Sequence, residues 1–441
     1  MTATVGWRGP ALAGLGLVDA AFLWWGSGGS AAQQLMAVLA AAVAGSAALL
    51  WLAWERRFEQ TPLVWVFALA LLLRIAAAQA TPLLEDDHFR YLWDGFRTAT
   101  TFDPYRLPPS AFFGNSDLAP LWQDILGGIN HPDITSIYGP VLQGLFAAAH
   151  AIAPGKVGAL QALLVAVDLA CLGLLVQQRV GKRWLLAYAL HPLILKEAIA
   201  SAHPDGLVAL WLLLALLAWQ RRRAVCIGVL LALAMATMVA ALVVLPLFLV
   251  GRGWRAAACA AAAFSITLLA LYLPMVAGGG SDAAGLWAFG TQWRFNPLLY
   301  RVVEVMLSPS SARAAAAALI VLGLAILARQ QRSGKTWPRA DSALLLLLLL
   351  SPVVNPWYWL WALGPAMMAM TATRLAVVAV AAVGALPYIN STVLKEAGWL
   401  AASGTFGVSW PITTLQLLVL VGALYFSAAS TRAATPPKPL V

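Results

Sequence analysis

The chain has 441 residues, of which 61% are hydrophobic and only 10% are charged. A water-soluble domain needs about a quarter to a third of its surface to be charged, so this composition excludes an ordinary soluble protein. The net charge of +10 does not indicate a nucleic-acid-binding protein, because the basic residues lie in short clusters between apolar runs and not along one face.

Apolar segments recur along the whole chain, each close to the ~20 residues that a helix needs to cross a bilayer. Lipid offers no partner to backbone polar groups, so these segments are expected to be helical. The sequence predicts an all-α polytopic transmembrane helix bundle of about 12–14 membrane segments in a single integral membrane domain, residues 1–441. The predicted spans are 11–28, 32–54, 63–80, 137–154, 157–177, 184–200, 206–219, 224–250, 255–277, 313–329, 342–354, 356–371, 375–392 and 410–429.

The orientation of the spans follows from Lys and Arg in short loops, which favour the cytoplasm. Clusters such as Arg56/Arg57 and Arg221 to Arg223 can all lie inside, together with both termini. This arrangement requires 137–177, hinged at Pro154-Gly155, to include a half-span or interfacial helix. It also requires 224–250 to be a bent, hairpin-like pair.

Residues 81–136 form the longest polar segment, and they contain eight of the 18 acidic residues of the chain. Aromatic residues are interleaved with these charges, a composition that predicts packed and interfacial helices and not a linker. We expect 81–136 to be an outer-face catalytic loop and 278–310 to be a second outer-face loop.

The acidic run Glu85-Asp86-Asp87 follows the third predicted span directly. Three consecutive carboxylates repel one another, so at least one should have a raised pKa unless a cation or a metal offsets the repulsion. One carboxylate could act as general base toward an acceptor hydroxyl while a neighbour holds a metal or orients the acceptor. The alternative is a solvated acidic helix start, stabilised by the helix dipole. In a helix, Asp86, Arg90 and Asp94 would share a face, as would Asp87, Tyr91 and Asp94.

Further polar motifs follow in chain order. In Asn130-His131-Pro132-Asp133, His131 could bind a phosphate or shuttle a proton, although a turn or capping role fits Asn130 and His131 equally well. The motif Ile137-Tyr138-Gly139-Pro140 then re-enters the membrane. In the second outer-face loop, 278–310, the guanidinium of Arg294 suits a phosphate.

Ionisable residues at membrane depth are costly and usually face a bundle interior or a cavity. Lys196 and Glu197 are adjacent and are not expected to share a helical face, whereas His203 and Asp205 could line a polar cleft. A helix-breaking interfacial loop is the alternative for this segment.

Two ionisable residues lie within predicted spans. Asp168 is expected to make a structural interhelical hydrogen bond. Arg74 is expected to snorkel to the interface or to meet a lipid phosphate.

The order of these motifs resembles the bacterial GT-C glycosyltransferases that use polyprenyl-phosphate sugars. The resemblance is greatest to the mannosyltransferase-like branch related to the catalytic subunit of the GPI-anchor mannosyltransferase. The matching motifs are the acidic pair, Arg-Tyr-Leu-Trp-Asp-Gly (90–95), Asp-Pro-Tyr (103–105), Asn-His-Pro-Asp (130–133), Ile-Tyr-x-Pro (137–140), Pro-x-x-x-x-Glu (192–197) and His-Pro-Asp (203–205). The match runs from about Arg74 to Trp361, and 86–140 is its most specific part.

The resemblance implies a GT-C-like fold in a bacterial cytoplasmic (inner) membrane, with the active site on the periplasmic or extracellular face. It implies transfer of a sugar, expected to be mannose, from a polyprenyl-phosphate donor to a lipid-linked or cell-envelope glycan acceptor in a single inverting displacement. An acidic residue after the first core span is the base in that family, which corresponds here to Asp86 or Asp87, with Asp86 favoured. No cofactor is required by this scheme, although Asp86 and Asp87 are also candidate ligands for a divalent cation, Mg²⁺ or Mn²⁺.

Substrate contacts are expected from polar and cationic groups around the acidic pair, and Arg74 is a further candidate for the donor phosphate. The expected substrate-binding residues are Glu85, Arg90, Tyr91, Asp94, His131, Tyr138, His203, Asp205, Arg294 and Asn355. Similar proteins typically have His-Asn-Asp in place of the 203–205 motif and His-Pro-Trp-Tyr where this chain begins with Asn355. The second departure removes a phosphate-binding histidine.

Two other classes fit parts of the pattern. A transporter or flippase would also have broken spans and buried ionisable groups, but it should show paired hydropathy halves, and none is evident. A non-catalytic assembly subunit of a cell-envelope pathway would keep working after loss of both Asp86 and Asp87.

Overall fold

The computed structural model describes residues 8–333, 337–369, 371–397 and 407–433. Within these ranges every regular element is a helix, apart from two isolated bridges, so the prediction of an all-α polytopic bundle is confirmed. Five helices are long and apolar enough to cross a membrane, namely Ala31–Trp54, Val157–Gln177, Trp254–Gly278, Pro309–Arg332 and Trp410–Ala429. Seven shorter apolar helices lie among them.

The first half of the chain forms α1 (Arg8–Gly26), α2 (Ala31–Trp54), η1 (Arg56–Gln60), α3 (Leu63–Ala77), α4 (Asp87–Thr101), η2 (Pro109–Phe112), α5 (Pro120–Gly127), α6 (Pro140–Ile152), α7 (Val157–Gln177), α8 (Lys182–Ala189), η3 (Ile194–Ala200) and α9 (Gly206–Gln220). The element η3 is a π-helix. The second half forms α10 (Ala224–Thr237), η4 (Val239–Val244), α11 (Leu245–Leu249), α12 (Trp254–Gly278), α13 (Ala283–Gln292), α14 (Tyr300–Met306), α15 (Pro309–Ser333), α16 (Ala340–Leu350), η5 (Pro356–Tyr358), α17 (Trp359–Met368), α18 (Ala372–Ala382), η6 (Leu386–Tyr388), α19 (Ser391–Glu396) and α20 (Trp410–Ala433).

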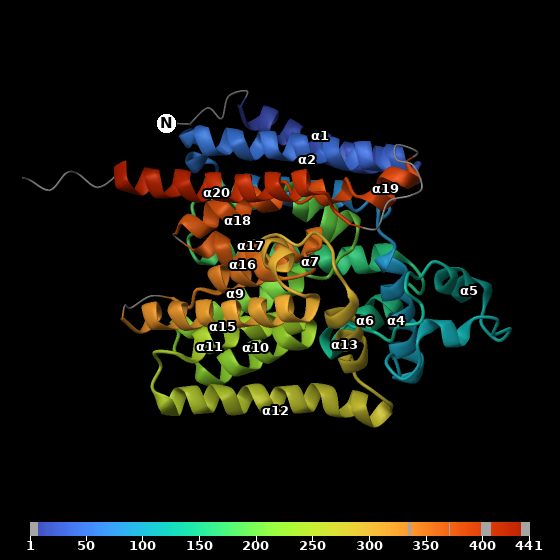
Figure 1. Cartoon of the computed structure of the whole chain (residues 1–441). Helices are drawn as coiled ribbons and strands as arrows, with labels where there is room; N and C mark the ends of the chain where they lie inside the picture. The colour runs from blue at the N-terminus through green and yellow to red at the C-terminus, as the bar shows by residue number, and fades with distance from the viewer. Residues whose placement is uncertain (1–7, 334–336, 370, 398–406, 434–441) are drawn as a thin grey trace, which may run out of the picture.

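The long helices α2, α12, α15 and α20 lie roughly parallel, and α4, α5 and α6 gather beyond one end of the bundle (Figure 1). One extended apolar core joins α1 to α3 with α7 to α9 and α16 to α18. At the edge of the molecule, α12 is largely exposed and carries apolar side chains such as Ile266, Leu269 and Leu273 on its exposed surface. A helix with this exposure and composition suits direct contact with lipid.

The two apolar runs that do not fit simple spans, 137–177 and 224–250, are both interrupted. Between α6 and α7 the chain turns at Pro154-Gly155, where Gly155 has a φ of +69°, a conformation that glycine adopts readily. The run 224–250 is divided into α10, η4 and α11, and Pro246 lies in the first turn of α11, where its missing N–H costs nothing.

Residues 81–136 include the helices α4, η2 and α5, and their aromatic side chains pack together as the composition predicts. Phe96 stacks on Trp122 with ring centroids 4.2 Å apart, and Trp93 meets Phe112 at 5.2 Å. Gly95 allows α4 to approach α6 closely, because a Cβ at this position would lie 2.5 Å from the carbonyl oxygen of Phe146. The loop is therefore fixed against the bundle at the middle of α6.

Inside the bundle, Arg74 and Asp168 form a buried ion pair, with Nε and Oδ2 2.7 Å apart. The hydroxyl of Tyr188 donates a second hydrogen bond to Asp168 at 2.8 Å, and Arg74 also donates to the carbonyl of Ala189. The predicted interhelical role of Asp168 is confirmed. The expectation that Arg74 snorkels or meets a lipid phosphate is wrong, because its side chain is fully buried and its charge is matched within the protein.

Candidate functional site

The acidic run lies at the start of α4, immediately after a strained turn. Leu84 has a φ of +59°, and its N–H donates to the side chain of Gln34 on α2 at 2.8 Å. A non-glycine residue in the left-handed region costs of order 1–3 kcal/mol, so it persists only where the surroundings hold it. Asp86 is the N-cap residue of α4, and Asp87 is its first residue.

Asn130 hydrogen-bonds both aspartates, although it lies 44 residues after Asp86 and 43 residues after Asp87 in the chain. Its side-chain amide donates to Oδ1 of Asp87 at 3.3 Å and also to Oδ1 of Asp86. The donor lies between two carboxylates that would otherwise repel each other. The sequence predicts a capping or turn role for Asn130 as one alternative and does not predict its contact with the two aspartates.

The three carboxylates of the run lie in different environments. Desolvation, together with the charge of Asp87, raises the pKa of Asp86 to about 6. Burial alone would raise the pKa of Asp87, but His203 and Asn130 outweigh it and the pKa is lowered. Burial raises the pKa of Glu85 to about 8 although the positive charges of Lys196 and His203 oppose this. The prediction that at least one of these carboxylates has a raised pKa is confirmed.

His203 joins this run to the interior of the bundle. Its side chain is fully buried, with Nε2 3.8 Å from Oδ2 of Asp87 and Nδ1 3.3 Å from Oε2 of Glu197. The imidazole stacks on Trp357, with centroids 3.9 Å apart and planes 10° apart. One side chain therefore touches the acidic run, the π-helix and the segment that begins at Asn355.

Asp205 is fully buried two residues further on. Its Oδ1 accepts a hydrogen bond from Nε1 of Trp361 at 2.6 Å, and its Oδ2 has no hydrogen-bond partner in the structure. A buried carboxylate oxygen without a partner is energetically costly.

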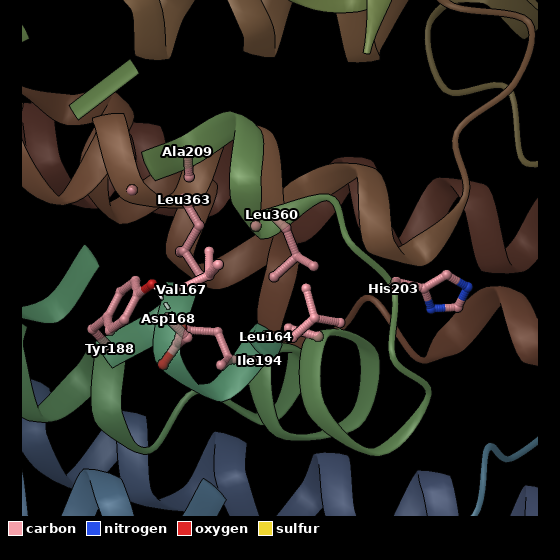
Figure 2. Close-up of a pocket in the computed structure, with 12 residues that line it drawn as sticks. Leu164, Val167, Asp168, Tyr188, Ile194, His203, Ala209, Leu360 and Leu363 are labelled. Atoms are coloured by element: carbon pink, nitrogen blue, oxygen red, sulfur yellow. Dashed lines mark hydrogen bonds between the residues drawn. The ribbon is translucent and has the colours of Figure 1, made fainter. Parts of the chain in front are cut away.

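A small cavity lies beside His203 and is lined mainly by apolar side chains (Figure 2). Figure 2 shows Asp168 and Tyr188 at one end and His203 at the other, with Leu164 and Leu360 between them. Asp168 is thus separated from His203 by apolar side chains.

Lys196 and Glu197 lie in the π-helix η3, and both side chains contact Tyr388. Lys196 Nζ lies 3.1 Å from Oε2 of Glu197, and both side chains contact the hydroxyl of Tyr388, which donates to Glu197 Oε1 at 3.0 Å. Although adjacent residues do not share a helical face, both side chains are long enough to reach Tyr388. Nothing in the local sequence signalled Tyr388.

The predicted pair on α4 is formed, since Arg90 Nε lies 2.9 Å from Oδ1 of Asp94. Arg90 also donates to the carbonyl of Ile134 at 3.0 Å, and Asp94 accepts hydrogen bonds from Ser136 and from Gln143 at 3.1 Å. Asp86, expected on the same face, instead hydrogen-bonds Asn130. Arg90 and Asp94 therefore secure the chain between α5 and α6, and their expected contacts with substrate stay predictions.

Tyr91 and Tyr138 form an aromatic wall beside the run. Tyr91 stacks on Phe146 with centroids 4.9 Å apart and meets Tyr138 edge-on at 5.2 Å. It also presents its ring to His203 at 6.2 Å. The structure thus brings Tyr91 and Tyr138 together with His203.

The second loop contacts the first through His131 and Trp293, whose rings lie 4.7 Å apart. Arg294, next in the chain, is exposed and makes a two-oxygen ion pair with Glu304 at 2.6 and 2.9 Å. Phe295 exchanges backbone hydrogen bonds with the segment that precedes Asn355, at 3.0 Å to Pro352 and 2.8 Å from Val354. The structure brings the loops together but does not place Arg294 beside the acidic pair.

Asn355 lies half-buried at the N-cap of η5, two residues before the tryptophan that stacks on His203. For the expected metal, no group of three or more His, Cys, Asp or Glu side chains suited to an ion occurs among the described residues. Asp86 and Asp87 supply two carboxylates, and Mg²⁺ is often held by one or two carboxylates with water and a substrate phosphate completing the shell. The cation remains a prediction.

Comparison with known protein families gives a match to a family model. A family model described as "Alpha-(1->6)-mannopyranosyltransferase, N-terminal domain" matches residues 3–252, more than half of the chain. The matched stretch includes the acidic run, Asn130, Glu197 and His203, whereas Arg294 and Asn355 lie beyond it. No curated protein and no solved structure matches the chain.

Proposed function

Because the chain belongs to this alpha-(1->6)-mannopyranosyltransferase family, it is a membrane mannosyltransferase, and we propose that its donor is a polyprenyl-phosphate mannose. The acceptor is a lipid-linked or cell-envelope glycan. The reaction takes place at the periplasmic or extracellular face of a bacterial cytoplasmic membrane, with both termini in the cytoplasm. Residues 81–136 are the catalytic loop of this GT-C-type enzyme, and 278–310 form a second loop on the same face.

One observation carries the proposal: two adjacent aspartates at the start of α4 both accept hydrogen bonds from Asn130, but Asp87 faces His203. This difference in surroundings lowers the pKa of Asp87, whereas desolvation raises that of Asp86. Titratable neighbours whose environments push their pKa values apart are typical of acid–base sites. A general base works best with a pKa near the working pH, which favours Asp86. Asp86 is also the more accessible of the two.

The reaction is an inverting displacement. Asp86 takes the proton of the acceptor hydroxyl as its oxygen bonds to the anomeric carbon of mannose, and the bond from that carbon to the phosphate oxygen breaks. Polyprenyl phosphate leaves with the electron pair, and nearby cationic groups stabilise its charge. Asp87 orients the acceptor, and a divalent cation held by Asp86 and Asp87 would add positive charge near the phosphate.

The proposal extends to the remaining predicted substrate contacts. Proposed contacts close to the acidic run in the chain or in space are Glu85, Tyr91, Asp94, Tyr138, His203 and Asp205. His131 and Arg294 are proposed for the donor phosphate together with Arg90 and Asn355. Arg294 must exchange its ion pair with Glu304 to serve in this way.

The proposal predicts transfer of radiolabelled mannose from polyprenyl-phosphate mannose to membrane glycolipids or glycans by the purified protein in nanodiscs. Parallel reactions contain a chelator or other polyprenyl-phosphate sugars. Transfer of mannose alone supports the donor, and loss of transfer on chelation supports the cation. If no polyprenyl-phosphate sugar is used, the proposed donor is wrong and transport of a lipid-linked substrate is the next hypothesis to test.

The pH dependence of kcat/KM should report the pKa of Asp86 in the free enzyme. The base must be deprotonated, so kcat/KM is expected to rise with pH through about 6 and to fall about tenfold per pH unit below it. Asn130→Ala removes a hydrogen bond that lowers the pKa of Asp86, so the acid limb should move to higher pH. An acid limb that stays in place in this variant would argue against Asp86 as the titrating group.

A further inference from the structure

The backbone holds His203 in an unusual turn between η3 and α9. Ala202 has a φ of +58°, which is rare for a residue with a side chain, and the N–H of His203 donates to the carbonyl of Glu197 at 2.9 Å. This turn directs the imidazole back along η3. The stacking on Trp357 then fixes the plane of the ring. The orientation of His203 is therefore determined by backbone strain and by packing together.

The two ring nitrogens of His203 face two different carboxylates. Nδ1 lies 3.3 Å from Glu197 and Nε2 lies 3.8 Å from Asp87, so the ring bridges the bundle interior and the acidic run. Neither nitrogen makes a hydrogen bond to a described residue, so the two carboxylates act on the ring through their charge, and each faces a different edge of the imidazole. The same orientation of the ring determines where Asp87 contacts Nε2 of His203.

Glu197 is itself held on two sides. Lys196 contacts its Oε2 at 3.1 Å, and the hydroxyl of Tyr388 lies 3.0 and 3.2 Å from its two oxygens. All three side chains are buried, and burial of charges is costly unless they are paired and hydrogen-bonded. Packing alone does not require a carboxylate here, and π-helical segments occur frequently at functional sites.

We propose that Glu197 is a positioning residue for Asp87 and acts through His203. Glu197 holds the imidazole so that Nε2 faces Asp87, and Asp87 is thereby kept in the place where it orients the acceptor. The proposal rests on the proposed function for the role of Asp87. Glu197 thus affects catalysis through His203 and Asp87 and not by contact with the substrate.

The test compares Glu197→Gln with Glu197→Asp in nanodiscs, with mannose transfer as the readout. Gln keeps the shape but loses the charge that faces His203, so kcat should fall on the order of 10–100-fold, the usual effect of removing such a supporting carboxylate, with little change in donor KM. Asp keeps the charge and should recover part of kcat. Asp341→Asn is the matched control, because Asp341 is also buried and paired with Arg339, far along the chain from the acidic run.

A double-mutant cycle tests whether Glu197 acts through His203. If it does, Glu197→Gln combined with His203→Gln should lower kcat no further than His203→Gln alone. Additive losses would overturn the proposal. Equal losses in Glu197→Gln and in the Asp341 control would also overturn it, since they would indicate a general structural effect.

Nitrogen NMR of ¹⁵N-histidine protein gives a readout that does not depend on the donor. The signals of His203 are identified by their absence in His203→Gln. Glu197→Gln should shift the Nδ1 signal and also the Nε2 signal, which faces Asp87; an unchanged Nε2 signal would contradict the proposal. If wild-type protein transfers no mannose, the proposed function fails, and the NMR result alone decides the role of Glu197.

Discussion

Replacement of Asp86 by asparagine is expected to lower kcat for mannose transfer about 10²–10⁴-fold, the contribution typical of a general base. Asparagine has nearly the same shape and can still accept a hydrogen bond from Asn130, but it cannot take the proton of the acceptor. The fold should be retained because the side chain lies at the accessible end of α4. The measurement is kcat at saturating donor in nanodiscs.

The matched control for Asp86→Asn is Asp117→Asn, an exposed carboxylate in the same loop that does not contact the acidic run. Its kcat should equal that of the wild type. If Asp86→Asn keeps full activity while Asp87→Asn abolishes it, Asp87 is the base. Full activity in both variants would argue against either aspartate as the base.

Replacement of Arg74 by methionine is expected to lower the free energy of unfolding by about 3–5 kcal/mol. The change leaves the carboxylate of Asp168 buried without its cation, and only the hydroxyl of Tyr188 remains as a partner. The measurement is reversible unfolding in bicelles. Since the pair is separated from His203 by apolar side chains, kcat per folded molecule should be unchanged (Figure 2).

Two further variants test the origin of this loss. Arg74→Met combined with Asp168→Leu removes both charges and should recover most of the stability, because the uncompensated buried charge causes the cost. Arg183→Met breaks a more exposed pair with Glu59, and its effect should stay below about 1 kcal/mol. A loss that small for Arg74→Met would mean that water reaches the buried pair.

Features with a short-range physical signal were predictable from the sequence. Apolar runs of membrane length identified the helices, Pro154-Gly155 identified the break between α6 and α7, and the spacing of Arg90 and Asp94 identified their ion pair. The acidic run was conspicuous for its charge alone. The helix begins at Asp87, so Asp86 occupies the N-cap position without a side-chain capping hydrogen bond and does not join the face of Arg90.

Contacts across long sequence separations could not be predicted in this way. Arg74 finds Asp168 94 residues further on, and Glu197 meets Tyr388 191 residues further on. The charge of Asp168 within a span predicted a hydrogen bond to another helix but not its partner, and no periodicity marks Tyr388. The positions of Lys196 and Glu197 also depend on a π-helical turn, which the spacing rules for an α-helix do not describe.

The contact between Tyr388 and Glu197 also determines when the site can be completed during biosynthesis. The acidic run, the π-helix and His203 leave the ribosome early, whereas Tyr388 lies in η6, near the end of the described chain. Because chains fold from the N-terminus as they are made, the carboxylate of Glu197 must enter the membrane with Lys196 as its first available neighbour. A nascent protein therefore gains a fully ordered site only once its C-terminal helices have joined the bundle.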